Sequence, residues 1–211
     1  MSGIVIIDYG MGNLKSVGNA FAHEGFKVKI SGLPGDVAGA RGLVLPGVGA
    51  FGRAMANLEE RGLISPLRER VLTGTPFLGI CLGLQLLFEA SEEAPGVTGL
   101  SLLPGKVARF RGNFKIPLIG WNGLQVCRQS PLFQGVKARA YFYFVHSYYA
   151  QPREREDILA LSSCGGDFPA VVGRQNLFGL QFHPEKSGRE GLKIIRNFGR
   201  MVTGREHHSR H

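Results

Sequence analysis

Short apolar runs alternate with amphipathic segments along the first half of the chain. Buried strands are expected where these runs are continuous or alternate, at residues 4–7, 26–30, 42–45 and 77–80. Residues 14–24 carry apolar side chains at helical spacing. Residues 50–72 predict two helices broken near Gly62 and Pro66, and a further helix is predicted over 82–90. This alternation predicts an α/β protein with a mainly parallel sheet.

The second half has a different pattern, in which short apolar runs are separated by glycine, proline and serine. Its expected strands and hairpins cover residues 116–119, 140–145, 158–161, 170–173 and 177–182. A last helix is predicted over 188–202. Because no internal repeat or linker intervenes, residues 1–203 are predicted to form one domain. Residues 204–211 are predicted to be a flexible tail whose histidines are solvated rather than metal-bound.

Composition favours an ordinary folded protein. Of the 211 residues, 44% are hydrophobic and 19% are charged, which argues against disorder and allows a substantial core. The cysteines at positions 81, 127 and 164 are too scattered for a disulfide framework and fit a reducing compartment. The chain has neither a signal-peptide pattern nor an apolar run of about 18 residues, so a cytoplasmic protein without membrane contact is expected.

Positive charge is concentrated in one stretch. The formal net charge is +9, and residues 94–153 contain no acidic side chain. The basic residues of this stretch are Lys106, Arg109, Arg111, Lys115, Arg128, Lys137, Arg139 and Arg153. No helix-turn-helix, zinc-finger or RNP-like pattern accompanies them, so a solvated strand-and-loop face is favoured over a nucleic-acid site. An acidic protein partner remains an open alternative.

Cys81 lies in Gly79-Ile80-Cys81-Leu82-Gly83, between an expected strand and its helix. This Gly-x-nucleophile-x-Gly pattern is typical of a sharp turn that presents a nucleophile. A helix N-terminus favours the thiolate, and the backbone N–H of Leu82 can serve an oxyanion. Chance would flank one of three cysteines with two glycines in roughly 6% of such chains, so the position between strand and helix carries weight. Cys127 and Cys164 lack these features and are interpreted as small buried hydrophobes.

A cysteine nucleophile needs a base, and the base needs an orienting acceptor. Of the six histidines, only His183 ends an apolar run and is followed two residues later by an acid, Glu185. Residues i and i+2 of an extended segment point the same way, and Pro184 restricts the backbone between them. A surface turn would explain this motif on its own. Together with the cysteine turn, it favours a triad of Cys81, His183 and Glu185.

Two glycine-rich turns also follow expected strands. Gly47, Val48 and Gly49 belong to Pro46-Gly47-Val48-Gly49, which can present a second backbone N–H to an oxyanion, although an ordinary turn fits equally well. The segment 8–13 lacks the G-x-G-x-x-G of a dinucleotide site. No cofactor and no metal ion are expected.

The segments 79–85 and 183–185 together resemble the class I, or triad-type, glutamine amidotransferases. A narrower resemblance is to the glutaminase subunits of imidazole glycerol phosphate synthases. It rests on five motifs in the same order, at residues 8–14, 45–51, 120–122, 144–148 and 183–187. The resemblance spans about residues 4–200. It implies a three-layer, flavodoxin-like fold and an enzyme that hydrolyses glutamine to glutamate and ammonia.

The resemblance also implies roles for individual residues. Cys81 would attack the carboxamide carbon to leave a glutamyl thioester, while His183 relays protons and Glu185 holds His183. The oxyanion hole would combine the N–H of Leu82 with that of Val48, after a peptide reorientation in the 46–49 loop. The groups expected to bind the α-amino and α-carboxylate groups of glutamine are Gln85, Glu93 and the backbone of Ser147 and Tyr148. The residues expected toward a partner are Asn13, Trp121, Tyr143 and Lys186.

A separate partner is expected because too few residues remain for a domain that would use the ammonia. The resemblance implies a synthase (cyclase) subunit, a (β/α)₈ barrel that forms a heterodimer with the glutaminase. That subunit would make imidazole glycerol phosphate and aminoimidazole carboxamide ribotide in histidine biosynthesis.

Three alternative functions are disfavoured. A glutaminase serving pyridoxal phosphate synthase would have different motifs at 8–14 and 45–51. A cysteine peptidase or chaperone-like relative usually has a histidine directly after the cysteine, where this chain has Leu82. A non-catalytic regulatory module would not need the intact triad.

Overall fold

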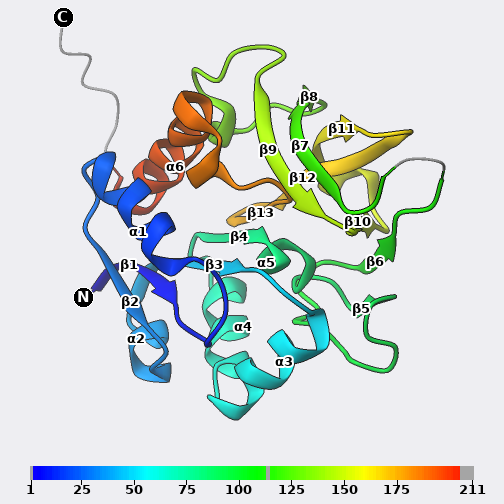
Figure 1. Cartoon of the computed structure of the whole chain (residues 1–211). Helices are drawn as coiled ribbons and strands as arrows, with labels where there is room; N and C mark the ends of the chain where they lie inside the picture. The colour runs from blue at the N-terminus through cyan, green and yellow to red at the C-terminus, as the bar shows by residue number, and fades with distance from the viewer. Residues whose placement is uncertain (1, 113–114, 205–211) are drawn as a thin grey trace, which may run out of the picture.

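A computed structural model describes residues 2–112 and 115–204, which form a central sheet with helices on both sides (Figure 1). Within these residues the sheet has eight strands in the order β2-β1-β3-β4-β13-β12-β11-β8. Its parallel strands are β1 (Ser2–Ile7), β2 (Val28–Ser31), β3 (Ala40–Gly47), β4 (Phe77–Cys81) and β13 (Leu177–Leu180). The antiparallel strands are β12 (Asp167–Arg174), β11 (Ile158–Ser163) and β8 (Gln125–Val126).

Helices α1 and α6 lie on one side of this sheet, and α2, α3 and α4 lie on the other (Figure 1). The helices are α1 (Leu14–His23), α2 (Pro34–Ala38), α3 (Phe51–Glu60), α4 (Ile64–Leu72), α5 (Leu82–Gln85) and α6 (Gly188–Thr203). Short 3₁₀ turns are η1 (Pro131–Phe133), η2 (Arg155–Asp157) and η3 (Pro184–Lys186).

Two smaller sheets complete the described fold. One has the order β10-β6-β5, from Tyr148–Pro152, Gly105–Arg109 and Ala90–Ser91, and the other pairs β7 (Leu118–Gly123) with β9 (Tyr141–His146).

The apolar run of β1 is continuous because both of its faces are covered. Ile4 and Ile6 belong to the core that contains α1 and α6, whereas Val5 and Ile7 belong to the core beneath α3 and α4. A strand buried on both faces has no solvent side that would require polar residues. The predicted three-layer α/β fold, with antiparallel strands added in the second half, is confirmed.

Three parallel strands bring the candidate site together. β4 pairs with β3 on one side and with β13 on the other, with Gly47 opposite Cys81 and Leu180 opposite Ile80. Since parallel strands end at the same edge, the turns after β3, β4 and β13 meet there. The 46–49 loop therefore lies beside the cysteine turn, where its backbone can reach the same site.

Of the two residues predicted to break the helices over 50–72, Gly62 does so and Pro66 does not. Gly62, with φ of 65°, separates α3 from α4. Pro66 does not break the helix, because it lies in the first turn of α4, where no intrahelical acceptor is available for its missing N–H. The predicted last helix matches α6, which ends at Thr203 and is capped by Gly204 with φ of 64°. The rest of the predicted tail, residues 205–211, lies outside the described residues.

The prediction of a helix over 82–90 is wrong beyond the first turn. α5 stops at Gln85, and the next three residues are fully buried. The carbonyls of Leu86 and Leu87 accept hydrogen bonds from the backbone of Leu100 and Leu102, which replaces the helical pattern. A one-turn helix has few aligned peptide dipoles, so its dipole supports a thiolate less than the sequence suggested.

Strands β6 and β10 were not predicted. Only Val107 and Ala108 of β6 are buried, so its apolar signal is weak.

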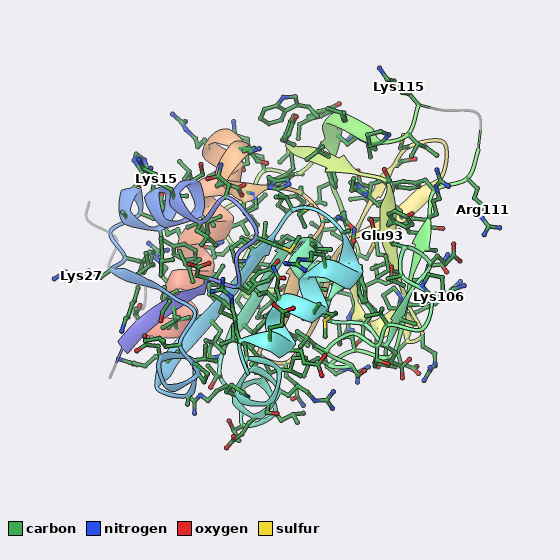
Figure 2. The ribbon with its side chains drawn as sticks, turned by 60° about the horizontal axis from the view of Figure 1, so that its bottom comes forward. Lys15, Lys27, Glu93, Lys106, Arg111 and Lys115 are labelled. Carbon is green, nitrogen blue, oxygen red and sulfur yellow. The ribbon has the colours of Figure 1, made fainter. Side chains whose placement is uncertain are left out.

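In this part of the basic stretch, Lys106 and Arg111 form ion pairs with Glu92 at 3.2 and 3.5 Å. Figure 2 shows Lys106, Arg111 and Lys115 projecting from one side of the molecule, away from Lys15 and Lys27. Among the described helices, all are too short or too polar to span a bilayer.

Candidate active site

Cys81 sits at the last position of β4 in a strained backbone conformation. Its φ of 56° and ψ of −109° are unusual for a residue with a side chain. The flanking glycines are required by packing. A Cβ on Gly79 would lie 2.5 Å from the carbonyl oxygen of Gly83, and a Cβ on Gly83 would lie 1.8 Å from that of Leu45. The glycines therefore let the turn close against β3.

Gly83→Ala is expected to destabilise the fold strongly. Its methyl group would overlap the Leu45 carbonyl at 1.8 Å, and that backbone is fixed in β3. We expect a loss of at least about 3 kcal/mol in the free energy of unfolding, measured by urea titration. Gly35→Ala in α2 is the matched control, because its Cβ would meet nothing within 4 Å. Equal unfolding midpoints for the two variants would contradict the packing argument.

His183 follows β13 and is oriented by Glu185. His183 Nδ1 lies 2.9 Å from Oε1 of Glu185, and the two side chains are only 4% and 1% exposed. A carboxylate can only accept, so Nδ1 carries a proton and Nε2 is the ring nitrogen that can gain or lose one. Ser187 fixes this turn: its Oγ donates to the His183 carbonyl at 2.6 Å and accepts from the N–H of Tyr143 at 3.0 Å.

The electrostatics of the site favour a protonated His183. Burial lowers the pKa of His183, but its interactions with Cys81 and with the Glu185 carboxylate outweigh burial and raise this pKa to about 9. Nε2 has no hydrogen-bond partner among the described residues, and the Cys81 thiol points to the Val145 carbonyl at 3.9 Å. Catalytic hydrogen bonds are often loose before substrate binds, so the missing bond between Nε2 and Sγ does not argue against the pair.

A cavity of about 280 Å³ opens beside Cys81. It brings together most of the residues expected from the sequence, namely Val48, Gly49, Cys81, Leu82, Gln85, Glu93, Ser147 and Tyr148. Gly47 lies behind it, where the hydroxyl of the buried Tyr9 would be 2.3 Å from a Cβ on Gly47. As the first residue of α5, Leu82 has no intrahelical acceptor for its N–H, so this group is available at the cavity wall.

Two polar side chains of the cavity already make hydrogen bonds to other protein groups through one of their polar atoms. Gln85 Nε2 donates to the Tyr148 carbonyl at 3.0 Å and to Gln181 Oε1 at 3.2 Å, which leaves the Gln85 oxygen for a ligand. Glu93 Oε2 accepts from the N–H of Phe51 at 2.8 Å and caps α3. Figure 2 shows Glu93 well inside the molecular outline, unlike the outward-pointing lysines. Both residues offer acceptors, which suit a positively charged amino group.

Comparison with known proteins agrees with this geometry. The model of the glutamine amidotransferase class-I family matches residues 5–202. The HisH subunit of imidazole glycerol phosphate synthase from Moorella thermoacetica is 51% identical over 202 residues, which cover 96% of both chains. The corresponding subunit from Geobacillus thermodenitrificans is 51% identical over 212 residues, covering 98% of this chain and 99% of its own. The chain belongs to the HisH family of class-I glutamine amidotransferases.

Solved structures support the fold of this HisH-family chain. A crystal structure of a glutamine amidotransferase matches with a TM-score of 0.76 at 20% identity, covering 96% of this chain and 99% of that one. PurLQS from Thermotoga maritima matches with a TM-score of 0.74 at 18% identity, covering 94% and 98%. At these identities the likeness concerns the fold alone.

Sequence reasoning on this HisH-family chain missed several residues at the site. Pro117, Val145 and His146 also line the cavity. Gln181 is fully buried, and its Nε2 lies 4.0 Å from Cys81 Sγ. A polar residue inside the apolar run 177–182 was the available signal for Gln181.

Three of the four residues expected toward a partner form one cluster, in which Trp121 and Lys186 are exposed and Tyr143 is half-buried. Trp121 and Tyr143 face each other across β7 and β9 with ring centroids 6.1 Å apart, and Lys186 Nζ lies 5.9 Å from the Tyr143 ring. Trp121 is 54% exposed. Asn13 is exposed on a different element, where its Oδ1 accepts from the N–H of Ser16 at 3.2 Å and caps α1.

Proposed function

We propose that this chain hydrolyses L-glutamine with a Cys81–His183–Glu185 triad. The ammonia then passes to a synthase subunit of histidine biosynthesis that makes imidazole glycerol phosphate and aminoimidazole carboxamide ribotide. The observation that carries the proposal is the meeting of three strand ends. The loop after β3 and the strained Cys81 at the end of β4 line one cavity, and the Glu185-bound His183 follows β13, the parallel strand next to β4.

The reaction follows from the positions of these groups. The thiolate of Cys81 forms a bond to the carboxamide carbon, and the oxygen becomes an oxyanion that accepts from the N–H of Leu82. The protonated His183 gives its proton to the nitrogen as the C–N bond breaks, and ammonia leaves a glutamyl thioester. His183 then takes a proton from water, which attacks the thioester and releases glutamate and the thiolate.

The remaining cavity groups bind the amino-acid end of glutamine. The Oε1 of Gln85 and the carboxylate of Glu93 accept from the α-ammonium group, and the backbone of Ser147 and Tyr148 holds the α-carboxylate. The loop of Gly47, Val48 and Gly49 supplies a second N–H to the oxyanion when the Val48 peptide reorients. Gly49 has φ of 108°, a conformation that residues with a side chain rarely adopt. Because glycine adopts it without steric cost, the loop can change its backbone conformation more easily here.

The synthase partner docks on the β7–β9 face as the second subunit of a cytoplasmic heterodimer, and its (β/α)₈ barrel receives the ammonia. This face presents Trp121 beside Ile119 and Tyr141, which are 57% and 61% exposed. Exposed aromatic and aliphatic side chains on one strand pair are typical of a docking surface.

A glutaminase that acts alone would waste its ammonia, so its activity is expected to be weak until it docks. Adding the synthase is therefore expected to raise glutamate release by the wild-type chain. Trp121→Ala is expected to need at least about tenfold more synthase for half-maximal stimulation, since buried tryptophans dominate interfaces. The control is Leu72→Ala, which removes a 75% exposed side chain from α4 on the other side of the sheet. Equal rates with and without the synthase would contradict the partner, and an unchanged Trp121→Ala titration would contradict the docking face.

A further inference from the structure

His146 is a buried polar residue at the cavity wall without a role in the steps above. It is 6% exposed, and three phenylalanine rings surround it. Its ring centroid lies 5.2 Å from that of Phe110, 5.7 Å from that of Phe144 and 5.3 Å from that of Phe168. An apolar shell of this kind penalises any polar atom that lacks a partner.

The hydrogen bond of His146 fixes its tautomer. Nδ1 lies 2.8 Å from the carbonyl oxygen of Tyr148, which can only accept, so Nδ1 carries the proton. Burial lowers the pKa of His146 to about 4, and the charge of His183 adds to this effect. The neutral ring therefore has one N–H, and it is used on the backbone two residues ahead. Nε2 is buried without a hydrogen-bond partner in the described part of the chain.

The bond spans a corner at which the chain changes sheets. His146 is the last residue of β9, which pairs with β7, and Tyr148 is the first residue of β10, which pairs with β6. Ser147 is the single residue between the two strands. The imidazole thus ties the end of one strand to the start of the next across the wall of the cavity.

The carbonyl that His146 holds is also bound by a second residue of the cavity wall, Gln85. The Tyr148 oxygen accepts a second hydrogen bond from Gln85 Nε2 at 3.0 Å. Gln85 Nε2 contacts Gln181 Oε1 at 3.2 Å, and Gln181 Nε2 reaches Cys81 Sγ at 4.0 Å. A shift of this carbonyl would therefore move both the cavity wall and a side chain that lines it.

We propose that His146 is a positioning residue, whose Nδ1–H holds the Ser147–Tyr148 corner so that its backbone can bind the amino-acid end of the substrate. This inference rests on the proposed glutaminase function. Only one ring nitrogen, Nδ1, has this positioning role, and Nε2 takes no part in the reaction.

Two amide side chains can separate the ring nitrogens. The amide nitrogen of asparagine can take the place of Nδ1, whereas that of glutamine reaches the place of Nε2. With the synthase present, His146→Asn is expected to keep KM for glutamine within about threefold of wild type. His146→Gln and His146→Leu lose the bond, and KM is expected to rise about tenfold with kcat changed much less, as for the loss of one hydrogen bond.

A second readout distinguishes positioning from general damage. Alkylation of Cys81 by iodoacetamide does not use the amino-acid subsite, so all three variants are expected to react at the wild-type rate. Wild-type KM in all variants, rescue by glutamine instead of asparagine, or an equal loss of kcat and alkylation rate would each overturn the inference. If wild-type protein with synthase released no glutamate, the proposed function itself would fail, independently of His146.

Discussion

Cys81→Ser is expected to lower kcat for glutamate release by at least about 10³-fold, because a nucleophile in a concerted triad cannot be replaced by its neighbours. The hydroxyl of serine is far less acidic than a thiol, so His183 would not hold it as an anion. Serine fits the strained backbone as cysteine does, because the two side chains differ by one atom. Glutamate release is measured with the synthase present.

The control is Cys127→Ser, which changes the same atom outside the cavity. Cys127 is exposed and Cys164 is half-buried, so their interpretation as small buried hydrophobes is wrong. Both variants are expected to bind the synthase with wild-type affinity, because neither site lies on the β7–β9 face. Normal turnover of Cys81→Ser would show that another residue is the nucleophile. An equal loss in Cys127→Ser would show that the effect is not specific to the nucleophile position.

The parallel half of the fold could be predicted because its signals are local. β1 is apolar at every position from Ile4 to Ile7, since helices cover both faces, and Gly62 lies at the break between α3 and α4. The early end of α5 could not be predicted in the same way. It depends on hydrogen bonds from residues 100–103 to carbonyls of residues 86–88, which no local pattern contains.

In the site, too, features with local sequence signals could be predicted, whereas features that depend on distant contacts could not. The proposed triad could be located from the sequence because each member lies in a motif at the end of a strand, and parallel strands bring these ends to one edge of the sheet. Gln181 and His146 were missed because their contacts are with distant residues or at a corner of the chain. Gln181 meets Gln85 across 96 positions of the sequence. The change of sheets at Ser147 appears only when β9 and β10 are paired with different strands.

Glu185→Gln is expected to lower kcat by roughly 10²- to 10⁴-fold, as when the acid of a related triad is neutralised. The amide has nearly the same size, and its oxygen can still accept from His183 Nδ1. The alternative rotamer donates to Nδ1 instead and stabilises the wrong tautomer. The control is Glu60→Gln, an exposed carboxylate at the end of α3. A Glu185→Gln enzyme with wild-type kcat at neutral pH would rule out the orienting role.

The same variant is expected to change how stability depends on pH. The pKa of His183 in the folded protein, about 9, lies above its ordinary value of 6.5. Protonated His183 therefore stabilises the fold fully below pH 6.5, and this contribution is lost as the pH rises toward 9. Without the Glu185 charge the pKa falls, so the loss between pH 6.5 and 9 should shrink by about 1–3 kcal/mol in urea unfolding. An identical pH dependence in both proteins would mean that Glu185 does not hold the charge of His183.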